Sequence, residues 1–192
     1  ENQGDITPYF EMLSYHFEMA EAYDKAILYL EKSGDKATKL NNYKRALDYY
    51  LKAIDLIEKH HKVEETIKIE VSTYKKIGKV YLVLDDKESA HETYHKALEI
   101  AQEHNLEIDI ADCLLNNGLI HFEALEYNEA LDAFIKAKEI YTEHKHDEGL
   151  ASAHLNIGLI ENIKGDTTSA KKTYESALHH YQKVGNLFGM AN

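Results

Sequence analysis

The sequence predicts an all-α protein built from stacked pairs of antiparallel helices. Apolar residues recur at spacings of three and four along most of the 192-residue chain, and no sustained alternating stretch indicates strands. The single proline, Pro8, stands almost at the start, so nearly the whole chain can be helical. A signature of glycine, alanine, an aromatic residue and alanine also repeats with a step of 40 residues. A fixed period of this kind is typical of stacked helical units rather than of one globular core.

The signature has three clear copies and one looser copy upstream. In each copy the alanine, aromatic residue and second alanine follow the glycine by 12, 16 and 19 residues. The looser copy comes first in this list: Gly34, Ala46, Tyr50, Ala53; Gly78, Ala90, Tyr94, Ala97; Gly118, Ala130, Phe134, Ala137; and Gly158, Ala170, Tyr174, Ala177.

Turn signals such as Asn41-Asn42, Leu125-Glu126 and Gly165-Asp166 divide the chain into nine predicted helices. The segment Ser33-Gly34-Asp35 predicts that the second helix is kinked or split. Predicted N-caps are Asn42, Asp86, Asn128 and Asp166. The predicted helices are 7–20, 23–40, 43–60, 63–84, 87–104, 107–124, 127–144, 147–164 and 167–184.

The signature has a mechanical explanation. A glycine in the middle of a helix costs about 1 kcal/mol relative to alanine, so its recurrence at one register needs a packing reason. A residue without a β-carbon lets the first helix of a pair approach the second closely. The alanines provide small contact surfaces on the second helix, and the aromatic residue fills the remaining space.

With this register the chain resembles the tetratricopeptide repeat family over nearly its full length. The resemblance implies a solenoid that winds as a right-handed superhelix, with repeats longer than the usual length of about 34 residues. HEAT and armadillo repeats have periods near 40 but lack this register. The predicted organisation is a disordered or tag-derived tail (1–6), divergent N-terminal helices (7–62), three regular 40-residue units (63–184) and a truncated first helix of a further repeat (185–192). We therefore expect a fragment of a longer array, whose uncapped C-terminal end favours self-association.

Composition and charge restrict the kinds of partner. The formal net charge is −12, from 34 acidic and 22 basic residues, so phosphate backbones repel the chain and nucleic acid is not an expected partner. No apolar run is long enough to cross a bilayer, so no membrane partner is expected. The single cysteine, Cys113, excludes an internal disulfide and favours a reducing, cytoplasmic location.

In tetratricopeptide arrays the first helix of each pair lines a concave groove, so the resemblance implies a peptide-binding surface at fixed positions around each glycine. Asn116 and Asn156 share one register, and an asparagine amide can both donate to and accept from a peptide backbone. Lysines in the first clear copy would attract acidic side chains. The candidate groove residues are Lys75, Lys76, Lys79, Asp112, Leu115, Asn116, Leu119, Phe122, Leu155, Asn156, Leu159 and Asn162.

Structural interpretations of the same residues remain open. The two asparagines can instead bond across neighbouring helices, and the lysines can form a solvated face. The pattern by which chaperone-binding relatives clamp an acidic C-terminal tail is not matched, because Ser152 and Asn156 stand where basic residues are required.

The sequence predicts no enzyme, no metal site and no cofactor. His91 and His95 have a spacing that can bind metal, but no third ligand is evident. Cys113 has no basic neighbour in sequence that would lower the pKa of its thiol. There is no glycine-rich phosphate loop and no arrangement typical of a nucleophilic triad.

The N-terminal phrase YHFEMAEAYDKAILYLEKSGDKA resembles helical arrays behind the ATPase modules of bacterial cyclases and transcription activators. We therefore predict a protein-interaction module that binds an extended peptide segment in its groove, from a larger cytoplasmic regulator. One alternative is an intramolecular regulatory arm of a signalling enzyme. A second is a receptor for a short signalling peptide.

Overall fold

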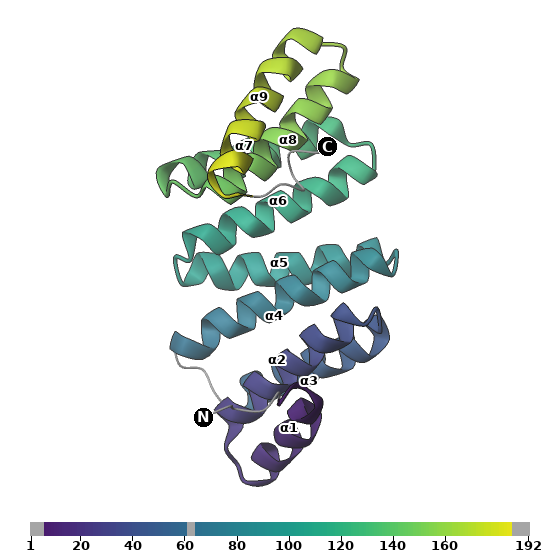
Figure 1. Ribbon diagram of the computed structural model, residues 1–192, viewed down its shortest axis with the longest axis vertical. Helices are drawn as coiled ribbons and strands as arrows, with labels where there is room; N and C mark the ends of the chain where they lie inside the picture. Colours follow the sequence, from purple (N-terminus) through teal and green to yellow (C-terminus); the bar gives the residue numbers. More distant parts are fainter. Residues whose placement is uncertain (1–5, 61–63, 186–192) are drawn as a thin grey trace. The chain divides into compact units, whose positions relative to one another are not determined.

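The computed structural model describes residues 6–60 and 64–185. Within these ranges the chain forms one short 3-10 helix, nine α-helices and no strand, so the predicted all-α fold is confirmed (Figure 1). The elements are η1 (Thr7–Tyr9), α1 (Phe10–Met19), α2 (Tyr23–Lys39), α3 (Tyr43–His60), α4 (Glu64–Val83), α5 (Lys87–Glu103), α6 (Glu107–Glu123), α7 (Tyr127–Glu143), α8 (Asp147–Ile163) and α9 (Thr167–Lys183).

The helix bounds follow the sequence prediction closely, with three differences. Helices α2 to α9 begin and end within one residue of the predicted bounds, whereas α1 begins at Phe10, after a 3-10 turn that contains Pro8. The second helix is not split, because α2 runs without interruption and the Ser33 hydroxyl bonds to the Tyr29 carbonyl of its own helix. Asn128 is not an N-cap, because α7 begins before it; its amide oxygen accepts a hydrogen bond from Lys164 Nζ at 2.8 Å.

Some parts of the predicted organisation lie outside the described residues. These are the tail up to residue 5, the boundary at residues 62 and 63, and the C-terminal segment from residue 186. The chain divides into two compact units, residues 1–100 and 101–192, which we call unit 1 and unit 2. The handedness of the superhelix stays a prediction, since each unit is described by itself.

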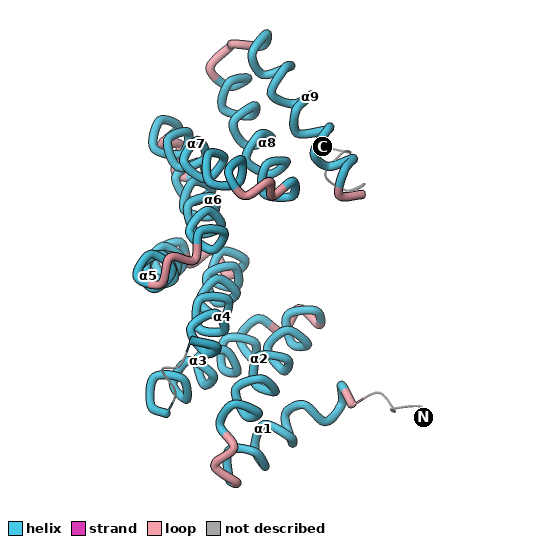
Figure 2. The backbone as a smooth tube through the Cα atoms, turned by 90° about the vertical axis from the view of Figure 1, so that its left-hand side faces the viewer, coloured by secondary structure: helices cyan, strands magenta, loops and turns pink. Residues whose placement is uncertain are grey.

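Consecutive helices pack against each other within each unit. In unit 1, α1 contacts α2, α2 contacts α3 and α3 contacts α4. In unit 2, α6 contacts α7, α7 contacts α8 and α8 contacts α9 (Figures 1 and 2). The bounds of α6 and α8 differ by 40 residues, as do those of α7 and α9. Unit 2 thus consists of two helix pairs in the same register.

The turns between helices that the structure describes share one geometry, which explains the regular turn signals. After α6, for example, Leu125 adopts a left-handed backbone with φ of 63°. The Leu125 N–H then donates to the Phe122 carbonyl at 3.0 Å and the Glu126 N–H donates to the His121 carbonyl at 2.9 Å. This pair of bonds is the Schellman motif, which satisfies the last carbonyls of a helix. Left-handed residues at equivalent positions are Glu21, Asn41, Asp85, Asn105, Lys145, Gly165 and Gly185.

The replacement Leu125→Gly is expected to stabilise the chain. A left-handed conformation costs a residue with a β-carbon about 1–2 kcal/mol, and glycine removes this strain. Part of the resulting gain in stability is lost, because glycine also increases the conformational entropy of the unfolded chain. Leu125 is 69% exposed, so its side chain contributes little packing, and Gly165 already stands at the same register one repeat later. We expect a gain of about 0.5–1 kcal/mol in the free energy of unfolding. Urea denaturation measures it, and a loss of stability would contradict the strain assignment.

The signature glycines lie against the aromatic residues of the same repeat. A β-carbon placed on Gly118 would lie 2.5 Å from Cε1 of Phe134, and one on Gly158 would lie 2.7 Å from Cε1 of Tyr174. Gly34 and Gly78 face Tyr50 and Tyr94 in the same way. Real β-carbons do not make such close contacts. The predicted close approach of the two helices is therefore confirmed in all four copies.

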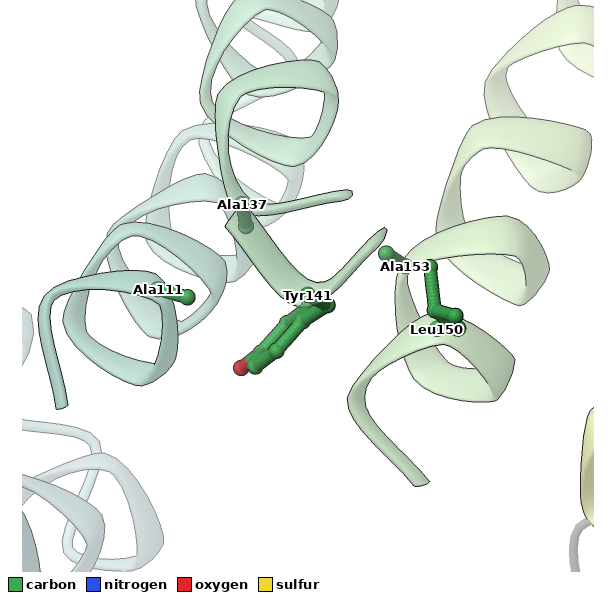
Figure 3. Packing of buried hydrophobic residues seen from close by; sticks show 5 residues of the cluster. All are labelled: Ala111, Ala137, Tyr141, Leu150 and Ala153. Atoms are coloured by element: carbon green, nitrogen blue, oxygen red, sulfur yellow. The ribbon is translucent and has the colours of Figure 1, made fainter. Parts of the chain in front are cut away.

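A second glycine–aromatic contact, between successive helix pairs, was not predicted. The ring of Tyr141 on α7 lies against Gly149 on α8. Figure 3 shows this ring among buried residues from three helices: Ala111 on α6, Ala137 on α7, and Leu150 and Ala153 on α8. Tyr141 thus fills the space between the two helix pairs of unit 2.

Candidate functional site

The predicted groove residues of unit 2 occupy equivalent positions on two first helices, α6 and α8, which contact each other. We call this surface the α6–α8 face. Its residues are Asp112, Leu115, Asn116, Leu119, Phe122, Leu155, Asn156, Leu159 and Asn162.

Most of the leucines of the α6–α8 face, and its phenylalanine, are partly exposed at the surface and partly packed against the core. Leu115, Leu119 and Phe122 are half-buried and pack against the cluster around Phe134. Leu155 packs against a cluster that contains Tyr181. Leu159, in contrast, is 36% exposed. The half-buried residues leave only part of each side chain to contact a ligand.

The two asparagines of the face make the same hydrogen bond. Asn116 Nδ2 donates to the Asp112 carbonyl at 2.6 Å, and Asn156 Nδ2 donates to the Ser152 carbonyl at 3.0 Å. Each acceptor lies four residues earlier in the same helix, so these bonds do not run across neighbouring helices. Neither amide oxygen bonds to any other residue in the described part of the chain.

Asp112 is held by a residue of the repeat interface. The Tyr141 hydroxyl donates to Asp112 Oδ1 at 2.6 Å, and burial, reinforced by the Asp112 charge, raises the pKa of Tyr141. Tyr141 also fills the space between the helix pairs, so the orientation of the Asp112 carboxylate depends on repeat packing. Asn162, at the other end of the face, is exposed.

The three candidate lysines lie on α4 in unit 1 and differ in their contacts. Lys76 Nζ contacts Glu31 Oε1 at 2.7 Å and Asp35 Oδ1 at 2.9 Å, so it already forms ion pairs with α2. Burial opposes the charge of Lys76, but the hydrogen bonds that Lys76 donates to the two carboxylates outweigh it and raise the pKa of Lys76. Lys75 is half-exposed and Lys79 is exposed. Sequence reasoning missed the Lys76 ion pairs, because their partners lie more than 40 residues earlier.

Unit 1 contains at least three cavities, and two of them contain a candidate lysine or an ion pair. One, of about 280 Å³, lies between α2 and α4 and includes Lys76 and Lys79 in its lining. The other, of about 210 Å³, lies between the α1 segment and helices α2 and α3. In the second cavity Arg45 and Glu11 form an ion pair at 2.7 Å, and this contact lowers the pKa of Glu11. These two charges therefore satisfy each other, and the third charged residue of the lining, Lys36, donates its Nζ–H to the Thr7 carbonyl at 3.2 Å.

Three features bear on other kinds of site. Among the described residues, no group of three or more His, Cys, Asp or Glu side chains is placed to hold a metal ion, so His91 and His95 remain a pair on α5. None of the helices in the described ranges is long and apolar enough to cross a membrane. Cys113 is fully buried and forms no disulfide.

A histidine pair joins α8 and α9 in unit 2. The rings of His154 and His180 stack with centroids 5.7 Å apart, and His180 Nδ1 lies 2.6 Å from Asp147 Oδ1. Lys183 Nζ also contacts this carboxylate oxygen, at 3.2 Å. Burial, together with the charges of Lys138 on α7 and His180 on α9, lowers the pKa of His154. A neutral His154 is therefore favoured in the folded state.

Acid is expected to destabilise unit 2 through His154. Because the pKa of His154 is lower in the folded state, the unfolded chain binds more protons, and stability falls as the pH falls below the ordinary histidine value of about 6.5. The variant His154→Leu carries the residue that the previous repeat has at this position, Leu114. Its melting temperature should fall less between pH 7.5 and pH 5.5 than that of the unmodified chain. An equal loss in the two proteins would contradict the assignment.

Comparisons with known proteins agree with this geometry. Two family models described as tetratricopeptide repeat match residues 34–60 and residues 109–183, which together make up just over half of the chain. The chain belongs to the tetratricopeptide repeat family. Arrays of such repeats form extended surfaces that bind other proteins, and the fold is typically a non-catalytic scaffold.

Solved structures of other tetratricopeptide-like proteins share the fold. BtubC from P. vanneervenii superposes with a TM-score of 0.72 at 17% identity, over 96% of this chain and 82% of its own. Aspartyl phosphate phosphatase F from Bacillus subtilis gives a TM-score of 0.77 at 17% identity, over 95% and 50% of the two chains. The Rap conjugation gene regulator of plasmid pLS20, in complex with a Phr peptide, gives 0.66 at 22% identity, over 86% and 43%.

The tetratricopeptide chain thus spans half or less of the length of the phosphatase and the plasmid regulator. At these identities the superpositions show a common fold. The comparison with curated proteins gives no significant match.

Proposed function

We propose that this tetratricopeptide chain is a protein-interaction module that binds an extended peptide segment along the α6–α8 face. The observation that carries the proposal is that Asn116 and Asn156, at the same register of two first helices, make the same hydrogen bond to their own helix. Each side-chain amide donates one N–H to a backbone carbonyl of its own helix, and this bond fixes the orientation of the side chain. The second N–H and the amide oxygen are left to bond to a ligand. An extended peptide backbone offers the complementary donor and acceptor at every residue.

The spacing of the two asparagines suits an extended ligand. Packed helices lie about 8–10 Å apart, and an extended chain advances about 3.3 Å per residue. Asn116 and Asn156 would therefore contact ligand residues about three positions apart. About one turn after each asparagine, the half-buried Leu119 and the exposed part of Leu159 would contact apolar side chains of the ligand.

The setting we propose is a larger cytoplasmic regulator that contains this module. The greater length of phosphatase F and of the plasmid regulator supports it, as does the peptide bound to the latter. That complex also favours the second candidate, a receptor for a short signalling peptide. The other alternative is an intramolecular arm that inhibits another domain of the same protein. Unlike a peptide receptor, such an arm would bind only a segment of its own protein. Self-association through the C-terminal end is a further proposal, which sedimentation velocity tests directly.

Peptide-display selection on the wild-type chain tests the proposed function. The double variant Asn116→Ala, Asn156→Ala is run beside it, after circular dichroism has shown that its helicity is unchanged. The selected peptides should bind the double variant about 10- to 100-fold more weakly, because each lost neutral hydrogen bond contributes about 0.5–1.5 kcal/mol.

The matched control is Thr142→Ala, Ser176→Ala. These hydroxyls also bond to carbonyls four residues earlier, at 2.7 and 3.1 Å, but they lie on the second helices α7 and α9. The control should bind the selected peptides with wild-type affinity. Absence of any enriched peptide, or equal affinity for both double variants, would contradict the proposal.

A further inference from the structure

The cavity between α2 and α4 in unit 1, which we call the α2–α4 pocket, has a lining unlike the α6–α8 face. Its volume of about 280 Å³ is below the range of about 300–1,000 Å³ typical of small-molecule sites. A space of this size suits one or two amino-acid side chains. The lining comes from α2, the first half of α3, and α4, all within unit 1.

The charges around the α2–α4 pocket are opposite to those of the chain as a whole. Three lysines and one carboxylate, that of Asp35, line it, whereas the formal net charge of the chain is −12. Lys76 forms ion pairs with Asp35 and with Glu31. Lys39 and Lys79 are exposed and form no ion pair within the described part of the chain. Two positive charges are therefore available to a ligand.

The remaining wall of the pocket consists mostly of apolar side chains, and the Thr38 hydroxyl in it donates to the Gly34 carbonyl at 3.0 Å. Val80 is buried, Val83 is 58% exposed, and the ring of Tyr43 lies at the start of α3. The Tyr43 hydroxyl donates to Asn41 Oδ1 at 2.9 Å, so its polar end is already satisfied. Tyr50 likewise donates its hydroxyl to Asp35 Oδ1 at 2.7 Å. These rings and the valines offer contact to apolar atoms.

This chemistry is confined to unit 1. One and two repeats after Lys79, the equivalent positions on α6 and α8 are Leu119 and Leu159. The equivalents of Lys76 are Asn116 and Asn156. Unit 1 therefore presents cations at the positions where unit 2 presents neutral amides and leucines.

We propose that the α2–α4 pocket holds an apolar side chain of an acidic protein segment, whose neighbouring carboxylates pair with Lys39 and Lys79. The inference rests on the proposed function and specifies the ligand class that unit 1 selects. Charge complementarity decides the occupant, because a basic or neutral segment gains nothing from the two unpaired cations.

The test uses two fluorescein-labelled peptides of eight residues, one alternating Asp and Leu and one alternating Asn and Leu. Fluorescence anisotropy measures their affinity at 50 and 150 mM salt. The Asp–Leu peptide should bind the wild-type chain at least tenfold more tightly than the Asn–Leu peptide at 50 mM salt, and the difference should shrink at 150 mM. Equal affinities, or no binding of the Asp–Leu peptide, would overturn the proposal.

Two double variants in the pocket and one control double variant locate the effect. Lys39→Glu, Lys79→Glu should lose at least tenfold affinity for the Asp–Leu peptide, and Lys39→Met, Lys79→Met gives a second test without charge reversal. The control Lys68→Glu, Lys171→Glu changes the net charge equally at exposed positions outside the pocket and should lose less than twofold. Equal losses in pocket and control variants would overturn the proposal.

The two proposals fail in different ways. Asn116→Ala, Asn156→Ala should weaken the display-selected peptides but leave the preference for the Asp–Leu over the Asn–Leu peptide unchanged, because that preference arises in unit 1. If this variant leaves the affinity for the display-selected peptides unchanged while the Lys39 and Lys79 variants weaken the Asp–Leu peptide, the α2–α4 pocket stands and the α6–α8 face is rejected. If only the asparagine variant has an effect, the pocket is rejected.

Discussion

Replacing Phe134 by alanine is expected to lower the free energy of unfolding by about 3–5 kcal/mol. The Phe134 ring is fully buried, and its cluster includes Ala130 on α7 together with Ile157 and Ile160 on α8. Removal of the ring leaves a cavity bounded on one side by Gly118, which has no side chain to fill it. Urea denaturation followed by circular dichroism measures the loss.

The control for Phe134→Ala is Tyr174→Ala, at the same register one repeat later. Tyr174 is partly exposed rather than buried, so its removal opens a smaller dry cavity. We expect the loss to be less than half of that for Phe134→Ala. Equal losses would show that the ring does not stabilise unit 2 through burial.

Replacing Gly118 by valine is expected to cost about 2–3 kcal/mol, even though valine is the better helix former. A β-carbon here would lie 2.5 Å from the Phe134 ring, and the ring is enclosed on its other sides. Either the helices separate or the ring leaves its rotamer. The same denaturation experiment gives the value, and an unchanged or increased stability would contradict the close approach.

The double variant Gly118→Val, Phe134→Leu tests whether the Gly118 effect acts through the ring. The smaller leucine side chain leaves room for valine, so the double variant should be more stable than the sum of the two single effects predicts. Residues in direct contact commonly show such coupling, of about 0.5–3 kcal/mol. Additive effects would show that Gly118 is required for another reason.

Much of the fold follows from local sequence because each helix boundary is encoded within a few residues. The left-handed positions at Asn41, Leu125 and Gly165 coincide with the turn signals, and the Schellman bonds involve only residues of the same turn. The contact of Gly118 with Phe134 was also predictable, because both residues recur at fixed offsets. Repetition makes a tertiary contact visible as a sequence pattern.

Contacts between helix pairs were missed. The contact of Gly149 with Tyr141 has no counterpart one repeat earlier, where Asp109 and Ala101 stand. Its counterpart in sequence one repeat later, Tyr181 with Gly189, extends outside the described residues. The ion pairs of Lys76 depend on Glu31 and Asp35, which belong to a different helix pair. Such pairings are set by packing between repeats, and the register of a single helix does not reveal them.

The candidate site was predictable to a smaller extent than the fold. The sequence indicates which residues share the α6–α8 face, because helix periodicity determines this. It does not indicate that Leu115 packs against the core, or that Asn116 bonds to its own helix. Both outcomes depend on side-chain rotamers and on neighbouring helices.

The most direct test of ligand binding on the α6–α8 face is an NMR titration of the asparagine side-chain amides with a peptide from the display selection. The signals of Asn116 and Asn156 should shift together and saturate at the peptide concentration that saturates binding. Backbone signals around Thr142 and Ser176, on the second helices, should remain in place. Shifts confined to α7 and α9, with both asparagine signals unmoved, would contradict the central claim that the first helices of unit 2 bind the ligand.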